Sequence, residues 1–113
     1  MIYEIRNYYF EPTRFDAYKS WAKNQAMAYL KRNLNVLGFW ANTDTKPEIN
    51  GRAMDDLGSA NITWIIGWAD ITQRKATLER VFAAPEWQAI FKNVPGGIGS
   101  YLRTECKFTE SLT

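Results

Sequence analysis

The first ten residues constrain the fold of this chain more than any other stretch. Residues 1–10 (MIYEIRNYYF) alternate with a period of two residues, which indicates a β-strand. Neighbouring side chains of a strand point to opposite faces, so Glu4 and Arg6 share a face with Tyr8 and Phe10. A face that mixes two charges with aromatic rings differs from an ordinary solvent-facing surface. We interpret it as one wall of a binding site.

Composition limits the class of protein. A chain of 113 residues that is 46% apolar can fill a two-layer core, and we expect one domain over residues 1–113. Fourteen Lys and Arg against 12 Asp and Glu are too balanced for a nucleic-acid-binding surface. No apolar run approaches the roughly 18 residues of a spanning helix, so no membrane insertion is expected. The single Cys106 and the lack of a signal-like start favour a cytoplasmic protein.

The remaining pattern predicts strands and helices in the order βαββαβ. Apolar residues three and four apart predict the helices, and alternation predicts the strands. The expected strands are residues 2–10, 35–42, 61–69 and 98–108, and the expected helices are residues 14–33, 72–84 and 86–93. Thr13 is a candidate cap for the first helix, and Asp70 or Thr72 for the second. Residues 43–60 form a long polar connection, with a short helical turn expected at residues 53–57. This order is that of a ferredoxin-like α+β fold, a four-stranded antiparallel sheet with helices on one face.

Large aromatic side chains predict a homodimer. The helices of such a fold cover one face of the sheet, and the other face meets water or a partner. We place Trp64, Ile66 and Trp68 on that uncovered face, with Trp40 on the neighbouring strand, and such an apolar patch indicates an interface. Two sheets packed face to face would give a dimeric barrel with an internal cavity. The alternative is that the Trp residues fill the core of the monomer.

Eight residues are the candidates for binding a small molecule. They are Glu4, Arg6, Tyr8, Trp40, Trp64, Trp68, Tyr101 and Arg103. The planar guanidinium of an arginine suits a carboxylate or enolate oxygen, and a tyrosine hydroxyl can donate to a developing negative charge. The alternative for Glu4 and Arg6 is a structural ion pair across strands with Arg103 or Glu105. The alternative for the aromatic residues is packing.

Several kinds of chemistry have no support in the sequence. The chain contains no histidine, so Cys106 lacks a base that could activate it as a nucleophile. Asp55 and Asp56 are the only adjacent acidic pair, and no further metal ligands lie near them. No cofactor and no metal are therefore expected.

Three segments resemble the NIPSNAP family. Residues 2–8 (IYEIRNY) look like the family's Y-E-(L/I)-R-x-Y opening, and residues 64–74 (WIIGWADITQR) are similar to its strand, acidic-aliphatic turn and arginine. Residues 84–87 (APEW) resemble its D-P-E-W element. The resemblance implies the dimeric α+β barrel superfamily, which includes cofactor-free monooxygenases and polyketide cyclases. The chain departs from the family pattern in two places. Many members carry a His and a Trp on the third strand, where this chain has Trp64 and Ile66, and the connection at residues 43–60 is longer than in many members.

Two functions follow from these observations. The first is a protein of unassigned reaction that binds a small apolar or aromatic molecule in a barrel cavity. The second is a cofactor-independent enzyme, of the monooxygenase or cyclase/isomerase type, acting on an aromatic or polyketide-like substrate. In the enzyme, Arg6 would polarise an oxygen, Tyr8 or Tyr101 would move a proton, and Glu4 would be the carboxylate base.

Overall fold

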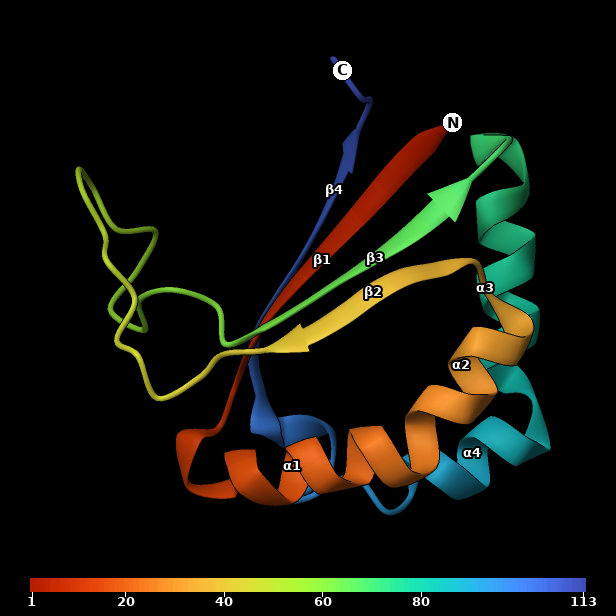
Figure 1. The fold of residues 1–113 in the computed structure, drawn as a ribbon. Coiled ribbons are helices and arrows are strands. Elements are labelled where there is room, and N and C mark those ends of the chain that lie inside the picture. The colour runs from red at the N-terminus through yellow and green to blue at the C-terminus, as the bar shows by residue number, and fades with distance from the viewer.

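The computed structural model describes all residues 1–113 and contains a four-stranded antiparallel sheet with the strand order β2-β3-β1-β4 (Figure 1). The strands are β1 (Ile2–Phe10), β2 (Val36–Ala41), β3 (Ile62–Trp68) and β4 (Tyr101–Thr109). Helices follow β1 and β3. The predicted βαββαβ order and ferredoxin-like α+β fold are therefore confirmed.

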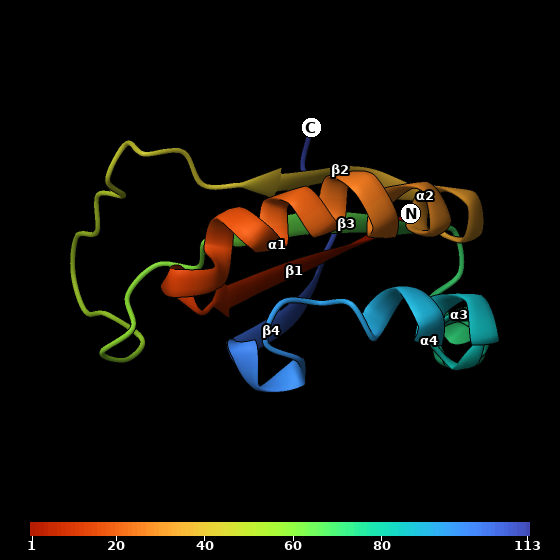
Figure 2. The same cartoon turned by 90° about the horizontal axis from the view of Figure 1, so that it is seen from below.

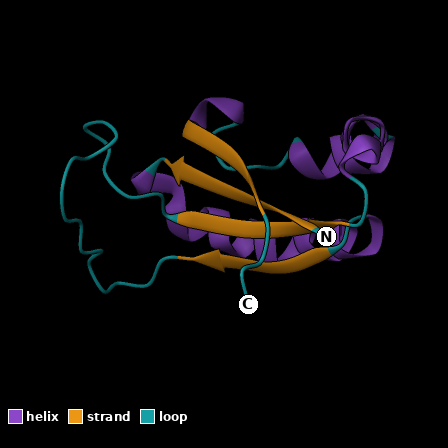
Figure 3. Ribbon diagram, turned by 90° about the horizontal axis from the view of Figure 1, so that it is seen from above, coloured by secondary structure: helices purple, strands orange, loops and turns teal.

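The helices lie on one face of the sheet, and no helix covers the opposite face (Figures 2 and 3). Between β1 and β2 the chain forms η1 (Pro12–Arg14), α1 (Phe15–Trp21), the π-helical segment η2 (Ala22–Ala26) and α2 (Met27–Asn33). Between β3 and β4 it forms η3 (Ile71–Gln73), α3 (Arg74–Ala83), α4 (Pro85–Phe91) and η4 (Ile98–Ser100). None of these helices combines the length and the apolar character that crossing a bilayer requires.

Carboxylates begin both helical regions. The Glu11 side chain accepts a hydrogen bond from the Thr13 backbone N–H at 3.2 Å, so the prediction of Thr13 as the cap is wrong. Asp70 accepts from the Thr72 N–H at 3.0 Å, which confirms the first of the two caps considered there. In each case a side-chain oxygen satisfies a backbone donor that has no partner within the helix.

The connection between β2 and β3 contains no helix or strand and extends away from the sheet (Figure 1). The expected helical turn at residues 53–57 is absent. Instead, the Asp55 carboxylate accepts from the Leu57 N–H at 2.9 Å, a local turn contact. Arg103 holds this region by donating to Asp55 at 2.5 Å and to the Gly58 carbonyl at 2.6 Å.

Strand register places the Trp residues differently from the prediction. Glu4 pairs with Ile66 and Arg6 pairs with Trp64, and paired residues of adjacent strands share a face. Trp64, Ile66 and Trp68 are therefore buried under the helices, 3%, 0% and 8% exposed, and the prediction that they lie on the uncovered face is wrong. For these residues the alternative, packing within the monomer, is the one observed.

Trp40 does lie on the uncovered face and is 53% exposed. A Cβ atom at Gly38 would come within 2.1 Å of the Trp40 ring, so this ring fills the space of the missing side chain. Covering a strand glycine with an aromatic ring compensates for the packing that glycine lacks.

An irregularity in the pairing of β1 with β4 separates two residues that the alternation had placed together. Tyr9 pairs with Arg103 but Phe10 pairs with Tyr101, so β4 contains one extra residue at this point. Tyr101 therefore faces the helices, whereas Arg103 faces the uncovered side. Alternation along the predicted strand at residues 98–108 places Tyr101 and Arg103 on one face, and this placement is wrong.

A buried carboxylate joins the sheet to the second helical region. Glu4 is fully buried, and its Oε1 accepts hydrogen bonds from Trp68 Nε1 at 2.9 Å and Arg74 Nε at 2.6 Å. Its Oε2 accepts from Arg74 Nη2 at 3.0 Å and Arg6 Nη1 at 2.6 Å. The carboxylate thus pairs with Arg6, as considered above, but its other partner is Arg74 of α3 rather than Arg103.

The pKa of Glu4 is lowered in the folded protein. Burial by itself would raise this pKa, because desolvation disfavours the charged form. Hydrogen bonds from Arg74 and Trp68, with the charge and hydrogen bond of Arg6, outweigh that effect and favour the carboxylate.

We predict that Glu4→Gln destabilises the fold by about 3–5 kcal/mol, because it removes the only negative charge between two guanidinium groups. Urea unfolding at pH 7 measures this change. Glu79→Gln, at an exposed position of α3, is the control and should change the free energy of unfolding by less than about 0.5 kcal/mol. Equal stability of the two variants would contradict the role given to Glu4.

The lowered pKa also predicts a pH dependence. Because the folded-state pKa lies below the ordinary value of 4.5, the carboxylate stabilises the fold fully above that value. This stabilisation is lost as the pH falls through the folded-state pKa. The stability difference between the wild type and Glu4→Gln, measured from pH 7 to pH 3, should be constant above about pH 5 and shrink below 4.5. A difference that stays constant to pH 3 would contradict this assignment.

Candidate functional site

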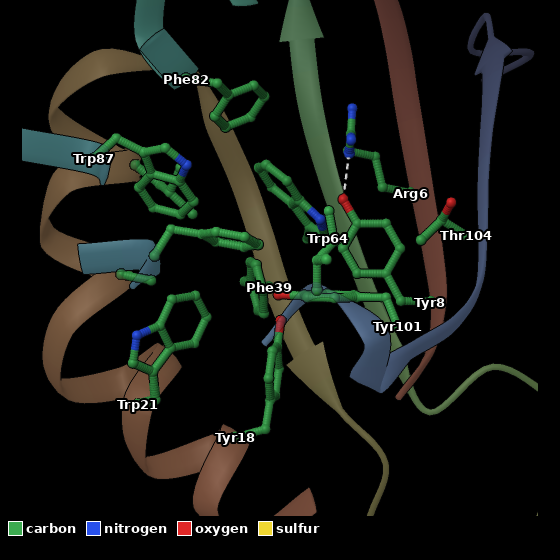
Figure 4. A pocket seen from close by; sticks show the side chains of 14 residues that line it. Arg6, Tyr8, Tyr18, Trp21, Phe39, Trp64, Phe82, Trp87, Tyr101 and Thr104 are labelled. Carbon is green, nitrogen blue, oxygen red and sulfur yellow. Dashed lines mark hydrogen bonds between the residues drawn. The ribbon is translucent and has the colours of Figure 1, made fainter. Parts of the chain in front are cut away.

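A cavity of about 380 Å³ lies between the sheet and the helices. Twelve of its 14 lining residues are hydrophobic, and both helical regions and all four strands contribute to it (Figure 4). The labelled side chains of the wall are Arg6, Tyr8, Tyr18, Trp21, Phe39, Trp64, Phe82, Trp87, Tyr101 and Thr104. Mostly apolar clefts or cavities of a few hundred Å³ with few polar groups are typical of small-molecule sites.

The polar groups of the cavity gather at the β1 side. Arg6 Nε donates to the Tyr8 hydroxyl at 2.6 Å, and the Arg6 guanidinium lies 5.3 Å from the centre of the Trp64 ring (Figure 4). The indole nitrogen of the buried Trp64 is turned toward the Tyr8 hydroxyl (Figure 4) and is near enough to favour the ionised form of Tyr8, but it reaches hydrogen-bond geometry with no atom of the protein. An unpaired buried N–H costs about 1–3 kcal/mol, which makes it an exceptional feature of a folded chain.

Glu4 fixes the direction of Arg6. One nitrogen of the guanidinium is bonded to the Glu4 carboxylate and another to Tyr8, so the planar group cannot rotate without breaking a charged hydrogen bond. Glu4 itself does not line the cavity. Its four hydrogen bonds and lowered pKa make it a weak base, unlike the catalytic carboxylate considered from the sequence.

Three tyrosines of the cavity keep their protons at neutral pH. Burial raises the pKa of Tyr8, and the nearby Arg6 opposes this only in part. Burial likewise raises the pKa of Tyr18 and of Tyr101. The Tyr101 ring meets Tyr8 edge to face, with centroids 5.6 Å apart. These phenols are therefore hydrogen-bonding groups rather than bases.

The helical wall is held by bonds to backbone carbonyls. Trp21 Nε1 donates to the Ile90 carbonyl at 2.9 Å, and the Tyr29 hydroxyl donates to the Val81 carbonyl at 2.6 Å. These bonds connect the first helical region to α4 and α3. The π-helical segment η2 lies in the same wall and contributes Ala26 to the cavity. Short π-helical segments are rare and occur frequently at functional sites.

The structure divides the eight predicted residues among three places. Arg6, Tyr8, Trp64 and Tyr101 line the cavity together. Glu4 and Trp68 lie on the same face of the sheet but outside the cavity, and they are hydrogen-bonded to each other. Trp40 and Arg103 belong to the uncovered face, so the structure does not bring them to the cavity.

Sequence reasoning missed the helical half of the site and one arginine. Tyr18, Trp87 and Phe91 line the cavity, although their helical spacing predicts only a buried face. Spacing cannot distinguish a side chain that packs against its neighbours from one that borders a cavity. Arg74 had one signal, its place in the segment that resembles the NIPSNAP family.

Several solved structures share the fold of this chain. An uncharacterised NIPSNAP domain protein from Burkholderia xenovorans has a TM-score of 0.73 at 17% identity, over 98% of this chain and 94% of that chain. A NIPSNAP family protein of unknown function from Agrobacterium tumefaciens has a TM-score of 0.73 at 20% identity, over 96% and 86%. An antibiotic biosynthesis monooxygenase is more distant, with a TM-score of 0.56 at 14% identity over the full length of both chains.

At these identities the structural likeness establishes the fold alone. No curated protein matches the sequence. The NIPSNAP family profile, however, matches residues 3–104, which include β1 from its second residue, the Arg6–Tyr8 contact and all the helices. The chain therefore belongs to the NIPSNAP family.

Proposed function

We propose that this protein, acting as one domain over residues 1–113, binds a small apolar or aromatic molecule in the cavity between its sheet and its helices. The observation that carries the proposal is the unpaired Trp64 N–H in the wall of an aromatic space of about 380 Å³. A core optimised only for stability would fill such a space and pair such a donor. A ligand would do both.

A neutral fluorescent probe tests this proposal. We expect N-phenyl-1-naphthylamine to bind the wild type saturably with 1:1 stoichiometry. Thr104 is an exposed residue of β4 that also lines the cavity, so Thr104→Trp should obstruct access without disturbing the core. The expected result in a fluorescence titration is at least tenfold weaker binding by this variant.

Lys107→Trp is the matched control, because Lys107 is an exposed residue on the opposite face of the same strand. It should bind the probe like the wild type. No saturable binding by the wild type, or equal weakening by both substitutions, would contradict the cavity as the binding site.

The second candidate function is a cofactor-independent enzyme acting on an aromatic or polyketide-like substrate. Its specific support is Tyr8, whose oxygen accepts a hydrogen bond from Arg6, so that its proton is available to a substrate oxygen. The shared fold with an antibiotic biosynthesis monooxygenase is consistent with this reading. The firmly bound Glu4 disfavours any step that needs a carboxylate base there. The two functions differ in whether the bound molecule is recovered unchanged.

We also propose that two copies pair through the uncovered sheet face. Ile5 and Ile65 are directly paired at the centre of this face, and Trp40 and Leu37 are 53% and 46% exposed. Lys107, beside Ile5, lies toward the polar edge. An apolar centre bordered by polar residues is typical of a homodimer interface.

The single exposed Cys106, with no disulfide, is consistent with a cytoplasmic location.

Ile65→Glu tests this pairing, because it would place a charge at the centre of each interface. We expect the wild type and the control Ile71→Glu, on η3 away from this face, to sediment as dimers at micromolar concentration. Ile65→Glu should sediment as a monomer with an unchanged circular dichroism spectrum. A monomeric wild type would contradict the dimer.

A further inference from the structure

We propose that the molecule bound in this cavity carries a carboxylate, held by Arg6, Tyr8 and Trp64, and an aromatic body that lies among the rings of the helical wall. This inference rests on the proposed function and specifies the chemical class of its ligand. Four observations carry it: an unpaired donor, a second free donor, a net positive charge and an apolar remainder.

The unpaired donor is Trp64 Nε1. An indole N–H can donate but cannot accept a hydrogen bond, so only an acceptor atom satisfies it. The side chain is 3% exposed and its nitrogen has no partner in the protein. The group that completes this site must therefore bring an oxygen or another acceptor into the cavity.

The second free donor is the Tyr8 hydroxyl. Its oxygen already accepts from Arg6 Nε, and its proton has no acceptor within the chain. The Tyr8 phenol stays protonated at neutral pH, since burial raises its pKa. Arg6 Nη2 also makes no hydrogen bond within the chain, because Nε and Nη1 are the nitrogens that Tyr8 and Glu4 engage. Two donors that lack an acceptor in the protein, Trp64 Nε1 and the Tyr8 hydroxyl, thus lie at one end of the cavity, whereas the Arg6 side chain, which carries Nη2, is partly accessible to solvent.

Charge selects an anionic acceptor over a neutral one. The single carboxylate of Glu4 is paired with two guanidinium groups, Arg6 and Arg74, which leaves this cluster with a net charge of +1. Arg6 is the one charged residue that lines the cavity, so nothing there repels an anion. A carboxylate matches the guanidinium in geometry and cancels the excess charge in a site of low dielectric.

The rest of the cavity suits an aromatic body. Phe39, Phe82, Trp87 and Phe91 present rings to the interior and carry no charge. Aromatic rings pack well in offset or edge-to-face arrangements, as the rings of this wall already do among themselves. Naphthalene-2-carboxylate combines both parts and is a suitable probe.

Displacement of N-phenyl-1-naphthylamine by three matched compounds tests the inference. They are naphthalene-2-carboxylate, its primary amide and naphthalene. The wild type should bind the carboxylate at least tenfold more tightly than the amide or naphthalene. Trp64→Phe removes ring surface for every compound but a hydrogen bond for the carboxylate alone, so it should weaken carboxylate binding about fivefold more than naphthalene binding. Retained naphthalene binding also shows that the variant is folded.

Trp87→Phe is the control, because it removes ring surface far from the polar end and should weaken all three compounds by the same factor. Equal affinity of the wild type for the three compounds would overturn the carboxylate inference while leaving small-molecule binding intact. Failure of the wild type to bind N-phenyl-1-naphthylamine and all three compounds would overturn the proposed function, and the inference with it.

Discussion

The arrangement of this protein depends on one buried carboxylate. Glu4 accepts four hydrogen bonds from Arg6, Trp68 and Arg74, and these partners come from β1, the end of β3 and the start of α3. Desolvating a carboxylate is costly, and only such complete pairing makes its burial tolerable. Because the buried Glu4 carboxylate needs all of these partners, it fixes the position of the sheet relative to α3.

The candidate site follows from this anchor. Glu4 directs the Arg6 guanidinium, Arg6 directs the Tyr8 hydroxyl, and Trp64 stands beside both with an unpaired N–H. The opposite wall comes from helices that are tied together by hydrogen bonds to backbone carbonyls. One end of the cavity offers hydrogen-bond donors, and the rest of its wall is apolar. This division is typical of selective small-molecule sites, in which a few polar groups orient the ligand and aromatic rings supply contact area.

Alternation and helical spacing predicted the element order, the fold and the alignment of Glu4, Arg6 and Tyr8 on one face, because these depend on local periodicity. They misplaced Trp64 and Trp68, since the face that a strand turns toward the helices depends on its pairing with another strand. Arg103 and Tyr101 lie on opposite faces because β4 contains one extra residue between them, and alternation along the sequence does not reveal such an irregularity. Helical spacing does not distinguish a residue that borders a cavity from one packed in the core, and thus it did not predict that Trp87 lines the cavity.

A crystal structure of the protein purified from its own cells without denaturation tests the central claim most directly. The account predicts a small molecule between the sheet and the helical wall, with an acceptor oxygen about 2.7–3.2 Å from Trp64 Nε1. The contradicting result is a closed core, in which neighbouring rings fill the space and the Trp64 N–H donates to an acceptor of the protein itself.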